Sequence, residues 1–138
     1  MKTLNLKNTV LLLICIFGFS ISASAQKTTI QVNELPENAK RIVCMFHGFT
    51  GNKTEHNGHF RTLARLLAKK GVASIRMDYH GNGESDGEFY DFNFDDALDD
   101  AKRIIAYAKN VEGIEEVCLL GFSFGGGVAS LVANDENC

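Results

Sequence analysis

The sequence predicts an α/β fold in which parallel strands alternate with helices. Three short apolar runs, residues 41–46, 72–77 and 116–120, have the composition of strands that are buried on both faces. Two segments with helical periodicity separate these runs, and a third helix follows the last one. Because alternating strands and helices arise from helical crossovers between parallel strands, this order indicates a parallel sheet covered by helices.

The first predicted helix has an apolar face in which residues recur at three- and four-residue spacing. These residues are Phe60, Leu63, Ala64, Leu67 and Ala68. Lys69, Lys70 and Gly71 fit its C-terminus, where cations oppose the helix dipole and glycine adopts the left-handed cap. Residues 28–32 alternate in polarity and predict an edge strand before the core.

The second predicted helix begins after Asn93, which is a good N-cap, and has Asp95 and Asp96 in its first turn. Its predicted buried stripe consists of Leu98, Ala101, Ile105 and Ala108. The acidic run 95–100 matches no metal-ligand spacing, so we expect a solvated helix face rather than a metal site. The last helix is expected over residues 128–133.

The N-terminal segment predicts a secretory signal peptide over residues 1–25. Lys2 and Lys7 precede an apolar run over residues 10–21, and residues 23–25 read Ala-Ser-Ala before Gln26. A retained membrane anchor is the competing interpretation, for which the run is short. We therefore expect an exported protein, periplasmic or secreted, whose domain comprises residues 26–138 and has no membrane association after cleavage. The net charge of −3, without a basic cluster, gives no reason to expect nucleic acid as a partner.

Three cysteines follow the predicted cleavage site: Cys44, Cys118 and Cys138. An odd number leaves at least one thiol without a partner within the chain. Cys44 and Cys118 lie in apolar runs, and we expect them to be small core residues. A disulfide between them stays open if their two strands are neighbours.

The motif Gly121-Phe122-Ser123-Phe124-Gly125 follows an apolar strand and precedes a helix of small residues. This context is typical of a nucleophile elbow, in which Ser123 is exposed on a tight turn and Gly121 and Gly125 keep side chains out of it. The alternative is a glycine-rich turn with a capping serine. A phosphate loop is excluded, because Gly127 and Val128 stand where Lys and Ser or Thr are required.

The loop after the first core strand begins His47-Gly48-Phe49. A tetrahedral intermediate needs two N–H donors for its oxyanion, and we expect these to be the backbone N–H groups of Phe49 and Phe124. His47 is not expected to be the base, because the triad order of such folds is Ser, then Asp or Glu, then His. His56, His59 and His80 are expected in loops or at the surface for the same reason.

Three motifs in order, residues 47–52, 73–87 and 121–126, resemble the α/β-hydrolase superfamily. The closest resemblance is to bacterial cinnamoyl- and feruloyl-type esterases and to serine-aminopeptidase-like hydrolases, over residues 41–133. It implies attack by Ser123 on a small-molecule ester, with no metal or organic cofactor, and gives no oligomeric state. Those esterases commonly have His and Gln beside the serine, where this chain has Phe122 and Phe124, which changes the acyl pocket.

In that superfamily, further strands, a cap and the triad Asp and His follow the elbow helix. No histidine follows Ser123 here, and Asp135 falls in the elbow helix or at its end. We therefore expect residues 26–138 to be a truncated α/β-hydrolase domain, the N-terminal half of the fold, which is inactive alone. The alternatives are a peptidase or thioesterase of the same superfamily and a non-catalytic α/β binding domain.

Overall fold

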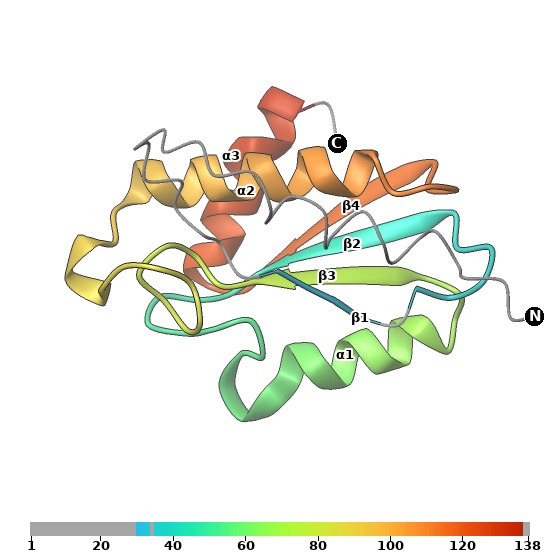
Figure 1. The fold of residues 1–138 in the computed structure, drawn as a ribbon, viewed down its shortest axis with the longest axis horizontal. Coiled ribbons are helices and arrows are strands. Elements are labelled where there is room, and N and C mark those ends of the chain that lie inside the picture. Colours follow the sequence, from blue (N-terminus) through green and yellow to red (C-terminus); the bar gives the residue numbers. More distant parts are fainter. Residues whose placement is uncertain (1–29, 34, 137–138) are drawn as a thin grey trace, which may run out of the picture.

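The computed structural model describes residues 30–33 and 35–136, which form one mixed sheet and its covering helices (Figure 1). The elements are β1 (Ile30–Asn33), β2 (Arg41–Phe46), the 3₁₀ turn η2 (His56–Gly58), α1 (His59–Ala68), β3 (Ala73–Met77), the 3₁₀ turn η3 (Phe89–Asp91), α2 (Phe94–Lys109), β4 (Glu116–Gly121) and α3 (Phe124–Glu136). The predicted signal peptide, residues 1–25, lies outside the described residues. In the described ranges, every helix is too short or too polar to cross a bilayer.

The sheet has the strand order β1-β3-β2-β4. Strand β2 is parallel to both β3 and β4, and Cys44 of β2 lies opposite Ile75 on one side and Leu119 on the other. This confirms the predicted α/β fold with parallel strands. Strand β1 is indeed an edge strand, but it runs antiparallel to β3, with Ile30 opposite Met77.

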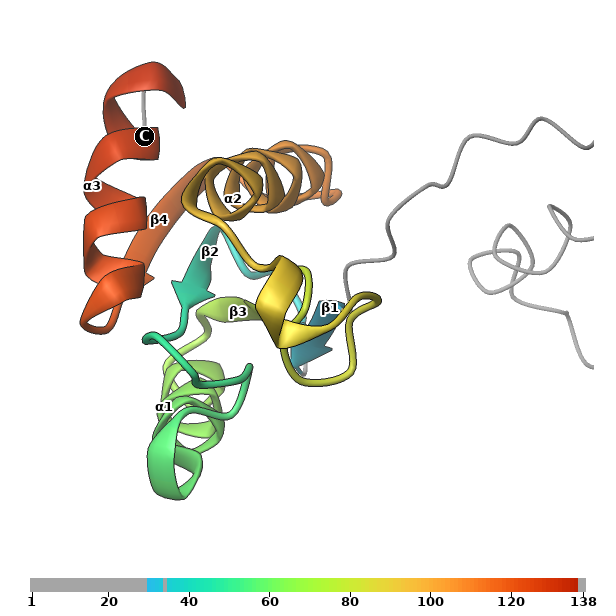
Figure 2. The same cartoon turned by 90° about the vertical axis from the view of Figure 1, so that its left-hand side faces the viewer.

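Helices cover both faces of the sheet, as Figures 1 and 2 show: α1 lies on one face, and α2 and α3 lie on the other. The alternating residues of β2 supply both cores. Ile42, Cys44 and Phe46 pack with α2 and α3, whereas Val43 and Met45 pack with α1. Strands β2 and β3 are thus buried on both faces, while β4, at the edge opposite β1, is only half-buried.

Local signals at the helix ends are confirmed. The Asn93 side chain accepts a hydrogen bond from the Asp96 N–H at the start of α2, and Gly71 has φ +75° after α1. Helix α3 begins at Phe124, four residues before the predicted start. Glycines 125–127 lower helix propensity, but packing of Val128 and Val132 on the sheet stabilises the whole helix.

The question of a disulfide between Cys44 and Cys118 is answered by the register. Their strands are neighbours, but Cys118 lies opposite Val43 and Cys44 opposite Leu119. Successive side chains of a strand point to opposite faces, so the two sulfurs lie on different sides of the sheet. Cys44 packs with α2 and α3, Cys118 packs with the α1 core, and no disulfide joins them.

Candidate active site

Ser123 lies at the sharp turn between β4 and α3, at the carboxyl end of the parallel strands. It is exposed and has φ +52°, a conformation that costs a non-glycine residue about 1–3 kcal/mol. The turn is closed by the Phe122 N–H, which donates to the Phe46 carbonyl at 3.0 Å, and by the Gly126 N–H, which donates to the Ser123 carbonyl at 2.9 Å. The strained serine is therefore held out from the surface by its backbone bonds.

The glycines on either side of the turn have no room for a side chain. A Cβ at Gly121 would overlap the Gly125 carbonyl, and a Cβ at Gly125 would overlap the Phe46 carbonyl and lie 2.6 Å from the His47 oxygen. Both positions therefore require glycine because backbone approaches backbone, as the elbow pattern predicts. Gly127, two residues further along α3, has no atom within 4 Å of such a Cβ.

The loop after β2 lies against this turn. A Cβ at Gly48 would lie 3.1 Å from the Phe122 ring and 3.5 Å from the Phe122 carbonyl. The loop turns back at once, because the Gly51 N–H donates to the Gly48 carbonyl at 3.0 Å. Glu55 also holds the loop, because its buried carboxylate accepts a hydrogen bond from the Gly48 N–H at 2.7 Å.

His47 belongs to the framework of this loop. Its Nδ1 lies 2.8 Å from the Gly48 carbonyl, which can only accept, so Nδ1 carries the proton, and Nε2 accepts from the Tyr79 N–H at 3.4 Å. Burial lowers the pKa of His47 from its ordinary value, against the opposing effects of the Gly48 carbonyl and Asp78. The ring is thus neutral, buried and bonded to backbone groups through both nitrogens.

The two residues predicted to supply the oxyanion donors have neighbouring side chains. The rings of Phe49 and Phe124 have centroids 6.2 Å apart. Among the hydrogen bonds within the described ranges, none uses the backbone N–H of Phe49 or of Phe124. Within these ranges both N–H groups have no protein acceptor, as the donors of an oxyanion site require. The roles of Ser123, Phe49 and Phe124 stay predictions.

Asp78 connects the loop after β2 to the loop after β3. It is buried, and its carboxylate accepts from the Lys53 N–H at 2.5 Å, from Lys53 Nζ at 2.6 Å and from the Glu84 N–H at 3.0 Å. Burial alone would lower the pKa of Lys53, but the hydrogen bonds to Asp78 and Glu84 raise it above its ordinary value. The ion pair thus ties the loop after β2 to the loop after β3.

One acidic residue lies where the sequence did not predict it. Asp100 is buried against the sheet rather than on the solvated face of α2, and its carboxylate accepts from the His80 N–H at 2.8 Å. It therefore acts as an anchor for the loop after β3. Across residues 35–135, no three His, Cys, Asp or Glu side chains are grouped so that they could hold a metal ion.

Sequence reasoning also missed an aromatic cluster beside the serine. Its rings have centroid distances of 5.4–6.2 Å and come from Phe49, Tyr79, Phe89, Phe92, Phe94 and Phe124. Phe49, with 58% of its surface exposed, and the less exposed Phe89 and Phe94 leave part of the cluster open to solvent. The run of phenylalanines over residues 89–94 was the available signal, but its partners come from distant parts of the chain.

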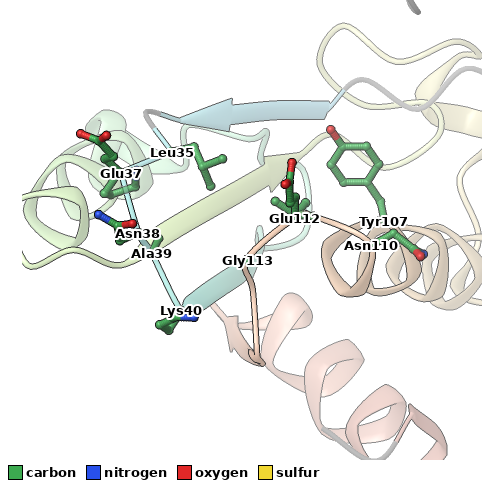
Figure 3. Close-up of a pocket in the computed structure, with 11 residues that line it drawn as sticks. Leu35, Glu37, Asn38, Ala39, Lys40, Tyr107, Asn110, Glu112 and Gly113 are labelled. Carbon is green, nitrogen blue, oxygen red and sulfur yellow. The ribbon is translucent and has the colours of Figure 1, made fainter. Parts of the chain in front are cut away.

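An open cavity of about 720 Å³ lies at the opposite end of the sheet (Figure 3). Leu35 and Lys40, before β2, and Tyr107 and Gly113, around the end of α2, line it. Ser123 follows the carboxyl end of β4, whereas this cavity borders the amino ends of β2 and β4. Its volume therefore has no part in the chemistry of the serine.

Residues 37–138 match the protein-family model described as serine aminopeptidase, S33. The chain belongs to this family of α/β hydrolases. The match covers every element of the chain from β2 to α3 and confirms the resemblance drawn from its three motifs.

Several solved structures share this fold. Est1E from Butyrivibrio proteoclasticus, solved with ferulic acid bound, superimposes with a TM-score of 0.76 at 28% identity over 83% of this chain and 46% of its own. An esterase from Exiguobacterium antarcticum gives 0.63 at 26% over 80% and 37%. A putative hydrolase from Agrobacterium vitis gives 0.71 at 24% over 82% and 41%. This chain thus spans less than half of each, and its described elements correspond to the N-terminal part of the fold.

Proposed function

We propose that this protein is a serine hydrolase of carboxylic esters. Ser123 Oγ forms a bond to the ester carbonyl carbon and gives its proton to a base. The tetrahedral oxyanion accepts hydrogen bonds from the Phe49 and Phe124 N–H groups. Its collapse breaks the bond to the alcohol, which leaves with the proton, and water then releases the acid from the acyl-enzyme by the same steps in reverse order.

The conformation of Ser123 is the observation that carries this proposal. A serine that only capped a helix would have extended backbone angles at an N-cap. Here Ser123 has φ +52°, is exposed, and stands between Gly121 and Gly125, where no Cβ fits. Such strain is retained where the surrounding structure imposes it, and reactive residues are a common reason.

The experiment that tests the proposal is labelling by a fluorophosphonate, which reacts with activated serines. In the complete product of the gene, we expect labelling of Ser123 and its loss in Ser123→Ala. Ser130→Ala is the matched control, because Ser130 is an exposed serine of α3 that bonds only to the Gly126 carbonyl among the described residues. Labelling that persists in Ser123→Ala would contradict the proposal.

We further propose an ester with an aromatic acid as the substrate. The open part of the aromatic cluster supports this, since aromatic rings pair favourably with one another. The ferulic acid bound to Est1E, which is 28% identical, supports it as well. Phe49 is the residue to test, because its ring is more exposed than those of Phe89 and Phe94 and packs against Phe124, the residue after the serine.

The ring of Phe49 provides a test of this substrate class. Phe49→Ala keeps the backbone N–H but removes the ring, so KM for a feruloyl ester should rise about tenfold while kcat changes little. An acetyl ester should be affected much less. Tyr90→Ala is the control, because Tyr90 is 84% exposed and lies outside the cluster. Equal changes for both esters would argue against aromatic recognition by Phe49.

A peptidase of the same family is the second candidate, and the description of the family model as a serine aminopeptidase favours it. The same serine and donors would act on an amide, whose amine must be protonated as it leaves. Turnover of an aminoacyl p-nitroanilide faster than that of any phenyl ester would favour this candidate.

We also propose that these 138 residues alone are inactive, because they supply no histidine after Ser123.

A further inference from the structure

Glu55 has a backbone conformation that glutamate rarely adopts. Its φ is +56° and its ψ is 171°, a region that glycine occupies almost exclusively. Only 9% of the residue is exposed, and its carboxylate accepts from the Gly48 N–H at 2.7 Å and from the His56 N–H at 3.0 Å. A glycine would relieve the backbone here but would provide no acceptor for the Gly48 N–H.

The Gly48 carbonyl is held from the other side. It accepts from His47 Nδ1 at 2.8 Å and from the Gly51 N–H at 3.0 Å. A peptide unit is planar and trans, so the N–H of Phe49 points away from the carbonyl of Gly48 in the same plane. Any bond that fixes this carbonyl therefore fixes the direction of the Phe49 N–H as well.

Both peptide units that meet at Gly48 are thus fixed by buried side chains. Glu55 holds the unit that contains the Gly48 N–H, and His47 holds the unit that contains the Gly48 carbonyl and the Phe49 N–H. Without the carboxylate, the first unit can rotate, and glycine offers no side-chain barrier to a compensating rotation of the second. Such a rotation would change the direction of the Phe49 N–H, the predicted oxyanion donor.

We propose that Glu55 is a positioning residue whose carboxylate holds the Phe49 N–H in the orientation that an oxyanion requires. This inference rests on the proposed function, because it concerns the donor that the reaction uses. Glu55 does not touch the reacting atoms. It acts through the Gly48 N–H, and the strain at its backbone is sustained by the two bonds that its carboxylate accepts.

The test compares three variants in the complete product of the gene, with an activated phenyl ester as substrate. Glu55→Gly removes the acceptor and relieves the backbone. We expect kcat to fall about 10- to 100-fold, somewhat less than the loss on deleting an oxyanion donor outright. KM should stay within about threefold, and the melting temperature should not fall, because relief of strain offsets the lost bonds. Glu55→Gln keeps an acceptor oxygen and should retain kcat within about threefold.

Glu55→Asp gives a second test, independent of glycine flexibility. It preserves the charge but shortens the side chain by one methylene, so kcat should fall as in Glu55→Gly if the reach of the carboxylate matters. Glu115→Gln is the control, since Glu115 is an exposed glutamate that pairs with Lys40 at the far end of the sheet. Its kcat should equal that of the unmodified protein.

The outcomes separate this inference from the function on which it rests. An unchanged kcat in both Glu55→Gly and Glu55→Asp, with turnover abolished in Ser123→Ala, overturns the positioning role alone. A fall in kcat that is matched by a fall in melting temperature in all three Glu55 variants identifies a merely structural residue and also overturns it. Full turnover in Ser123→Ala overturns the proposed function and the positioning role together.

Discussion

Gly125→Ala is expected to destabilise the fold by about 3 kcal/mol, the upper end of what an overpacked site costs. The added methyl group would overlap the Phe46 carbonyl and approach the His47 carbonyl to 2.6 Å. These are backbone atoms of the central strand and of the loop that carries Phe49, so neither can move aside without displacing the predicted donor. Chemical denaturation followed by circular dichroism measures the free energy of unfolding.

Gly127→Ala is the matched control for this prediction. It makes the same chemical change two residues along α3, where no atom lies within 4 Å of the new methyl group. Alanine in a helix interior is favoured over glycine by about 1 kcal/mol, so this variant should be as stable as the unmodified protein or more so. Equal denaturation midpoints for the two variants would show that the turn is not as tightly packed as the glycines indicate.

Much of the fold is predictable from local patterns along the chain. Apolar runs identify β2 and β3 because both faces of these strands are covered. The run of β4 also identifies a strand, but full burial was predicted for it and it is only half-buried, because it lies at the edge of the sheet. Asn93 and Gly71 mark the start of one helix and the end of another, because their roles depend only on neighbouring backbone groups. The antiparallel direction of β1 depends on pairing with a distant strand, and nothing in residues 28–32 encodes it.

The site is only partly predictable, for a similar reason. The motif around Ser123 and the loop at Phe49 carry their meaning within a few residues, so their proximity follows from the fold class. Asp100 was misread as a solvated residue, because the acidic run has no local feature that separates the buried carboxylate from its neighbours. Its partner, the His80 N–H, is twenty residues away in sequence. The aromatic cluster also depends on contacts between distant segments.

Glu55 shows most clearly which features of the site the sequence does not predict. In the sequence it is one glutamate in a polar loop, and a charged residue in such a loop is expected to be exposed. Its burial and its positive φ follow from two constraints that act at once: the Gly48 N–H needs an acceptor, and the Lys53–Asp78 pair fixes the chain two residues earlier. Neither constraint is visible before the loop is closed on the sheet.

The 138-residue chain by itself is expected to react with a fluorophosphonate slowly, and imidazole in solution should accelerate the reaction. Loss of the catalytic histidine of a serine hydrolase costs about 10⁶-fold in kcat, while the oxyanion donors still contribute. His47 cannot replace it, because both of its ring nitrogens are bonded to backbone groups and its pKa is lowered by burial. Free imidazole can approach the exposed Ser123 and accept its proton.

The labelling rate should therefore rise linearly with imidazole concentration, and this dependence should vanish in Ser123→Ala. N-methylimidazole, a base of similar strength that has no N–H group, should act equally well, since only an acceptor nitrogen is needed. Rapid labelling of Ser123 without added imidazole would mean that a histidine within the chain is the base. In that case His56→Ala, His59→Ala and His80→Ala would identify it. Within the described ranges, the rings of these three histidines, unlike that of His47, do not bond to the backbone through both nitrogens.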